Sequence, residues 1–131
     1  MSTLALIGVA GAVAASALHV AFWWLESITF RRPAVWRRFG VESQRDADVI
    51  APMAFNQGFY NLFIAIGTLV GVVILLDGDT QLGWSIMLFG CGMMVGAAFV
   101  LASTTFQLWR AAVMQGGPPL VCIVTGVFAL T

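Results

Sequence analysis

The sequence contains no lysine, and charged residues make up only 9% of its 131 positions. Soluble proteins carry about 25% charged residues, so this composition excludes an ordinary soluble domain. Six arginines balance six acidic residues, which leaves no net charge and no basic surface of the kind that binds nucleic acid. We therefore expect no nucleic-acid partner.

Residues that bind metals or carry out redox chemistry are also scarce. The two cysteines, Cys91 and Cys122, lie far apart in apolar segments, so they form neither a Cys-x-x-Cys motif nor a disulfide framework. The single histidine, His19, and one nearby carboxylate fall short of the three or four ligands that zinc needs. We therefore expect no metal site and no cofactor.

Hydrophobic residues make up 60% of the chain and are concentrated in long segments without charge. A helix needs about 20 apolar residues to cross the hydrocarbon core of a bilayer. The long segments predict an all-α, polytopic membrane protein, a bundle of four transmembrane helices in a single domain of residues 1–131. The predicted helices cover residues 4–30, 50–76, 80–106 and 117–131.

The last predicted helix is short because a Gly-Gly-Pro-Pro sequence, residues 116–119, precedes its apolar part. Proline lacks a backbone N–H, so it is favoured in the first turn of a helix and disruptive further inside. A helix that starts at this sequence extends only about 21 Å to the end of the chain. Transporters use a broken backbone of this kind at their binding sites.

The arginines predict the orientation of the protein in its membrane. Five of the six lie in the predicted loop of residues 31–49, between the first two helices. The positive-inside rule predicts that such a loop is cytoplasmic. Both termini and the acidic turn of residues 77–79 then lie outside. We expect a multi-pass protein of the bacterial inner (cytoplasmic) membrane, with membrane lipids as its immediate partners.

Polar residues within the predicted helices form two stripes. His19, Trp23 and Glu26 are spaced so that they share one face of the first helix. The second helix carries a wider stripe that consists of Asn56, Gln57, Tyr60 and Asn61. Both stripes reach the cytoplasmic half of the membrane, and Gln115 returns to the same half. We therefore expect a pocket between the helices that is lined by His19, Trp23, Glu26, Asn56, Gln57, Tyr60, Asn61 and Gln115.

Each of these residues also has a purely structural interpretation. Glu26 is close enough to the membrane surface to pair with an arginine, and His19 is of a type often buried in a protein core. Side-chain amides can join transmembrane helices by hydrogen bonds without binding any ligand. Trp23 can pack against lipid or other helices. Composition and spacing leave these interpretations open.

The same residues carry a resemblance to a known family. The chain resembles a bacterial family of small four-helix integral membrane proteins known as domain of unknown function 1304. The resemblance covers nearly the whole chain and rests on His19 and Glu26 in an aromatic-rich first helix, Trp36 in the arginine-bearing loop, and the segments 56–61 and 115–118. It implies a four-span inner-membrane protein and assigns no catalytic residue.

The leading interpretation is a small membrane protein that binds a lipid-like or amphipathic small molecule in the polar pocket, without a specified reaction. One alternative is a proton-coupled exporter, in which Glu26 exchanges a proton for a cationic substrate stacked on Trp23. A second is an intramembrane isomerase or cyclase that uses His19 and Glu26 as acid and base. A third is a structural accessory subunit of a membrane complex. Small residues one turn apart within the helices also allow a homodimer.

Overall fold

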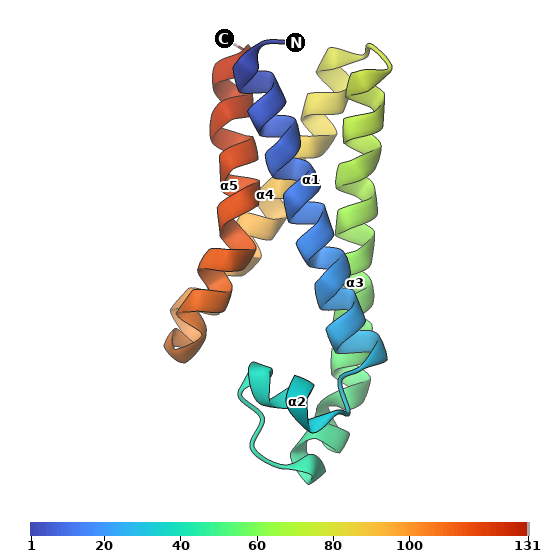
Figure 1. Ribbon diagram of the computed structural model, residues 1–131, viewed down its shortest axis with the longest axis vertical. Coiled ribbons are helices and arrows are strands. Elements are labelled where there is room, and N and C mark those ends of the chain that lie inside the picture. The colour runs from blue at the N-terminus through green and yellow to red at the C-terminus, as the bar shows by residue number, and fades with distance from the viewer. Residues whose placement is uncertain (131) are drawn as a thin grey trace.

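The computed structural model describes residues 1–130, and it consists of helices joined by short connections (Figure 1). Four of its helical segments are long and apolar enough to cross a membrane, which confirms the predicted all-α, polytopic architecture. The long helices are α1 (Thr3–Trp23), α3 (Gln44–Leu76), α4 (Thr80–Thr104) and α5 (Trp109–Leu130). The short elements are the π-helix η1 (Trp24–Ile28), α2 (Pro33–Trp36) and the 3-10 helices η2 (Arg37–Phe39) and η3 (Phe106–Leu108).

Three of the long helices begin at a side chain that caps their first turn. The capping residues of α1, α3 and α4 are Ser2, Ser43 and Asp79, whose oxygens accept backbone N–H groups at 3.2, 3.1 and 3.0 Å. Because the first N–H groups of a helix have no partner within it, such caps determine where the helix starts. The predicted start of the second long helix at residue 50 is therefore wrong, since its polar first turns belong to the predicted loop.

The four long helices form a bundle that is closed at one end and open at the other. α1 packs against α3 and α5, and α4 packs against the same two helices. Both chain ends lie at the closed end with the turn between α3 and α4, whereas α2 lies at the opposite end (Figure 1). At that second end, α4 and α5 diverge from α1 and α3. We call it the arginine end, because α2 and its flanking residues carry most of the arginines.

Glycines allow the helices of the closed half to approach one another. A Cβ atom on Gly11 would lie 2.9 Å from the carbonyl oxygen of Pro118, and one on Gly83 would lie 2.6 Å from the backbone of Leu75. Backbones in contact at such positions gain van der Waals packing, which drives helix association within lipid. The fully buried side chains between the helices include Met87, Met94, Cys91 and Cys122.

The predicted start of the last helix at residue 117 is also wrong. α5 begins at Trp109 and continues through Pro118 and Pro119, and together with η3 it is long enough to span a membrane. Proline is tolerated within a transmembrane helix where a neighbouring helix supports the interrupted turn. Here Gly11 of α1 provides that support, because its lack of a side chain brings α1 against the Pro118 turn.

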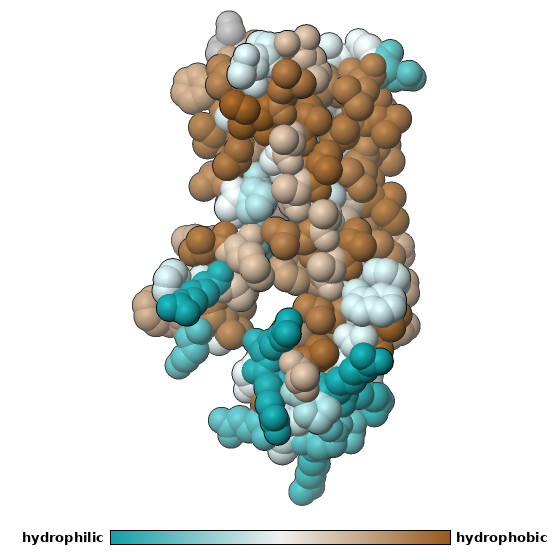
Figure 2. All heavy atoms as spheres, in the orientation of Figure 1, coloured by the Kyte–Doolittle hydropathy of each residue, from teal (hydrophilic) through white to brown (hydrophobic). Residues whose placement is uncertain are grey.

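The surface matches a membrane protein in its distribution of polarity. Hydrophobic residues cover most of the bundle, and hydrophilic residues gather at the arginine end (Figure 2). The surface is hollowed at this end, between the lower part of α5 and the segment around α2. The diverging helices therefore leave a real opening rather than a gap filled by side chains.

Candidate ligand-binding cavity

A cavity of about 360 Å³ lies between the long helices where they diverge, and we call it the inner cavity. Its lining is mostly apolar and consists of Phe22, Leu25, Phe39, Ile64, Met93, Met94, Ala97, Leu101, Leu108, Ala111 and Met114. The polar part of the lining consists of His19, Glu26, Arg38, Gln57, Asn61 and Gln115. All four long helices contribute, so the site exists only in the assembled bundle.

Five of the predicted pocket residues meet at the inner cavity, namely His19, Glu26, Gln57, Asn61 and Gln115. They come from α1, η1, α3 and α5, which brings together residues from both ends of the chain. The expectation of a pocket between these helices agrees with the structure. Ligand binding by these side chains stays a prediction.

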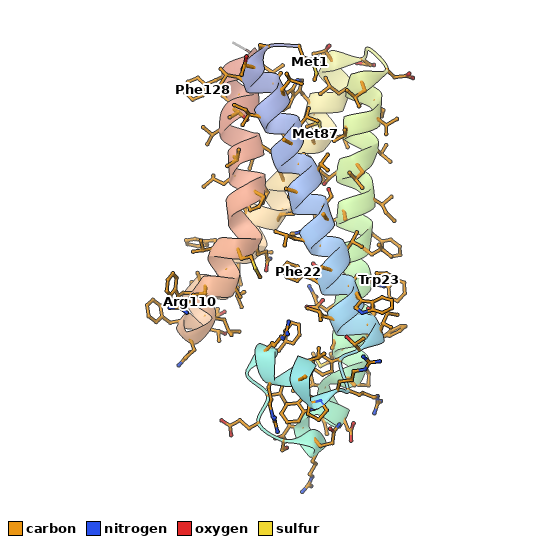
Figure 3. The ribbon with its side chains drawn as sticks, viewed as in Figure 1. Met1, Phe22, Trp23, Met87, Arg110 and Phe128 are labelled. Atoms are coloured by element: carbon orange, nitrogen blue, oxygen red, sulfur yellow. The ribbon has the colours of Figure 1, made fainter. Side chains whose placement is uncertain are left out.

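Three predicted residues lie elsewhere. Trp23 packs edge to face against Phe59, with 6.1 Å between ring centroids, and points away from the opening (Figure 3). Asn56 and Tyr60 are exposed on the outside of α3. Asn56 and Tyr60 are four residues apart and therefore share one face of α3. Gln57 follows Asn56 with a rotation of about 100° around the helix, so it lies on a different face. The wide stripe on α3 is thus two faces, and only one of them reaches the inner cavity.

Glu26 and Asn61 form the main polar contact in the wall of the inner cavity. The Nδ2 group of Asn61 donates a hydrogen bond to Oε2 of Glu26 across 2.7 Å, and both side chains are half-buried. Glu26 lies in the π-turn of η1, where the N–H of Thr29 bonds to the carbonyl of Trp24, five residues earlier, at 3.1 Å. Such turns are frequent at functional sites, because the extra residue redirects nearby side chains.

A glycine on α3 holds this turn close to the helix. A Cβ atom on Gly58 would lie 3.1 Å from Cβ of Glu26 and would contact Oγ of Ser27. The Ser27 hydroxyl donates to the carbonyl oxygen of Phe55 at 2.8 Å, which adds a second hydrogen bond between η1 and α3. The position of the Glu26 carboxyl therefore depends on the missing side chain at Gly58.

His19 is nearly fully buried, and its hydrogen bonding determines what it can offer to a ligand. Its Nδ1 atom lies 2.9 Å from the carbonyl oxygen of Ala15. A carbonyl only accepts hydrogen bonds, so Nδ1 carries the hydrogen, and the neutral ring has its lone pair on Nε2. This Nε2 atom forms no hydrogen bond with residues 1–130. His19 thus presents an acceptor to the inner cavity.

Glu26 also lines a second cavity, of about 510 Å³, between η1 and the first half of α3. Arg31 and Arg32 line this second cavity, but neither forms an ion pair with Glu26. The ion pair within residues 1–130 joins Arg31 to Asp48 at 3.0 Å, and both partners are largely exposed. The structural interpretation in which an arginine neutralises Glu26 is therefore not supported by the described residues.

Two parts of the inner cavity have no counterpart among the predicted site residues. Arg38 and Phe39 reach it from η2, which the left-handed Gly40, with φ of 77°, terminates. Helical periodicity cannot predict contacts made by such a connection. The second part is Met114, which lies four residues before Pro118 on α5. Within residues 1–130, no group of three or more His, Cys, Asp or Glu side chains could hold a metal ion.

Comparison with known proteins gives one match. The family described as a protein of unknown function (DUF1304) matches residues 6–127 of the chain. No curated protein and no solved structure matches the chain. The segment matched by the family contains all four long helices in large part and every polar residue of the inner cavity.

Proposed function

The chain belongs to the DUF1304 family of proteins of unknown function, and we propose that it binds an amphipathic small molecule in the inner cavity. The observation that carries this proposal is the Glu26–Asn61 hydrogen bond in the wall of a mostly apolar cavity. Ligand sites are typically concave and apolar, with a few polar groups that fix the orientation of the ligand. The inner cavity has this composition.

The position of the cavity favours a ligand that is apolar at one end and polar at the other. Its methionine, leucine and phenylalanine side chains can contact a hydrocarbon part, and a polar part can contact the Glu26–Asn61 pair. A polar group within a membrane is expensive unless it is satisfied, so polar residues there commonly mark a functional site. An amphipathic molecule would satisfy both kinds of lining at once.

We further propose that the protein lies in an inner membrane with its arginine end in the cytoplasm. Arg110 lies at the lower end of α5, on the same side as α2, which supports this orientation through the positive-inside rule (Figure 3). Cysteines introduced as Glu42→Cys and Asp77→Cys, in a chain without its native cysteines, provide the test. On intact cells an impermeant maleimide should label only the cysteine at position 77, and labelling only of position 42 would reverse the orientation.

Native mass spectrometry of the protein extracted in mild detergent tests the binding proposal. The Ala97→Trp variant fills the inner cavity, because Ala97 is part of its lining. Ala10→Trp is the matched control, since Ala10 is exposed on α1 and lies outside both cavities described above. We expect an adduct of low mass on the wild type and on Ala10→Trp, and its loss from Ala97→Trp.

Two outcomes would contradict the proposal. An adduct that persists in Ala97→Trp binds somewhere other than the inner cavity. A wild type without any adduct, even after incubation with lipid extract, would favour the accessory-subunit alternative, in which the polar residues serve assembly only. Thermal unfolding of both variants shows whether the added ring has damaged the fold.

A second candidate function is acid–base catalysis on a ligand of the inner cavity. It is favoured by the lone pair on Nε2 of His19 and by the Glu26 carboxyl, which line the same cavity. Once a ligand is identified, His19→Ala and Glu26→Gln should abolish its conversion and retain most of its binding. The exporter alternative loses part of its basis, since Trp23 does not line the inner cavity.

A further inference from the structure

We infer that the polar end of the ligand is a positively charged hydrogen-bond donor, a primary or secondary ammonium group. The inference rests on the proposed function and concerns the chemistry of the group that the inner cavity selects. It follows from a count of donors and acceptors among the buried and half-buried polar side chains that line the cavity.

His19 and Asn61 each present an acceptor among the polar groups of the lining. Nε2 of His19 has a lone pair and no partner within residues 1–130, because Nδ1 is engaged by the Ala15 carbonyl. Asn61 uses one N–H of its Nδ2 group to donate to Glu26, which leaves its Oδ1 oxygen and one N–H available to a ligand. His19 therefore offers an acceptor to a ligand, and Asn61 offers one acceptor and one donor.

The Glu26 carboxyl is the acidic group of the lining, and no cationic side chain within residues 1–130 forms an ion pair with it. Its Oε2 atom accepts from Asn61, and no arginine or histidine nitrogen within residues 1–130 lies within 4.0 Å of either oxygen. A carboxylate at membrane depth is costly unless a cation compensates it. An ammonium group compensates the charge and carries the N–H donors that such acceptors bind, a combination that neither a hydroxyl nor an anion offers.

The two prolines of α5 leave two backbone carbonyl groups without their usual donor in the helix. Pro118 and Pro119 have no N–H, so they cannot donate to the carbonyl groups four residues earlier, those of Met114 and Gln115. Both of these residues line the inner cavity. Freed backbone carbonyls are groups that membrane transporters use to bind cations.

The other polar residues of the lining do not reverse the preference for a cationic donor over an anion. Gln57 and Gln115 carry both donors and acceptors, so they fit either kind of ligand. Arg38 carries only donors and would favour an anion, but it belongs to η2 and its side chain is exposed. An exposed charge is solvated and screened far more strongly than a half-buried one. The half-buried Glu26 therefore determines the selectivity.

The experiment compares four probes that share an octyl chain: octylamine, octyltrimethylammonium, octanol and octanoate. Each is added to the purified protein in detergent at equal concentrations below its own aggregation threshold, and apparent Kd values come from the shift in thermal unfolding. We expect octylamine to bind at least about tenfold more tightly than each of the others, the ratio that one charge-assisted hydrogen bond provides. Octyltrimethylammonium has the charge but no N–H, and octanol has a donor but no charge.

Glu26→Gln and Glu42→Gln form a matched pair of variants for the same series. Both remove one carboxylate, but Glu42 is exposed in the segment before α3 and lies outside the inner cavity. The preference for octylamine should disappear in Glu26→Gln and persist in Glu42→Gln, while octanol binding should stay the same in both. Partitioning of the amine into detergent micelles affects all three proteins equally.

The outcomes separate this inference from the proposed function. Tighter binding of octanoate, or equal binding of octylamine and either octanol or octyltrimethylammonium, overturns the inference and leaves a ligand-binding cavity in place. Binding of octylamine that Glu26→Gln does not weaken also overturns it. Failure of all four probes to bind overturns both the inference and the proposed function.

Discussion

The hydrogen bond between Asn61 and Glu26 predicts an energetic coupling between two residues that are 35 positions apart. Its length of 2.7 Å lies at the short end of the range for N–H···O hydrogen bonds. Side-chain hydrogen bonds between membrane helices average about 0.6 kcal/mol and reach about 1.7 kcal/mol. Because this one is short and half-buried, we expect a coupling in the upper half of that range, about 1–1.7 kcal/mol.

A double-mutant cycle measures this coupling. The free energy of unfolding is obtained by titration with sodium dodecyl sulfate for the wild type, Glu26→Ala, Asn61→Ala and the double variant. The same cycle with Asn56→Ala in place of Asn61→Ala is the control, because Asn56 is an exposed asparagine on the same helix. We expect a control coupling within about 0.3 kcal/mol of zero. Equal couplings in the two cycles would refute the described register of α1 against α3.

Two further predictions follow from the packing. Gly58→Ala should lower the free energy of unfolding by about 1–3 kcal/mol, because the added methyl group meets η1. Gly67→Ala is its control and should cause no loss, since nothing lies within 4 Å of its Cβ position; equal losses would contradict the packing of η1 on α3. Cys91 and Cys122 are both 0% exposed, so a maleimide should label neither until detergent denaturation. Rapid labelling of the folded protein would show that the closed half of the bundle is loose.

The fold was largely predictable from the sequence because a membrane imposes a simple requirement. Backbone groups in lipid must be bonded within the helix, so the charge-free segments identify the transmembrane helices almost directly. The boundaries were less predictable where a polar turn extends a helix beyond the membrane, as at the Ser43 cap of α3. The continuity of α5 through Pro118 depends on its contact with Gly11, which no local pattern contains.

The polar residues of the site were predictable as a set but not individually. Asn56, Gln57, Tyr60 and Asn61 all lie at the right depth, and helical spacing divides them into two adjacent faces. Only the packing of α3 against α1 determines that Gln57 and Asn61 are the pair at the inner cavity. The contribution of Arg38 was not predictable, because it depends on how η2 folds back beneath the bundle.

Photo-crosslinking tests the central claim, that the inner cavity binds an amphipathic molecule, most directly. An octylamine that carries a diazirine on its chain is bound to the wild-type protein, activated by light and located by mass spectrometry of the peptides. We predict crosslinks concentrated at residues 93–97 and 111–115, which contain cavity-lining positions of α4 and α5, and their loss in an excess of octylamine. Crosslinks spread evenly over the lipid-facing surfaces of the helices, without competition, would contradict the claim.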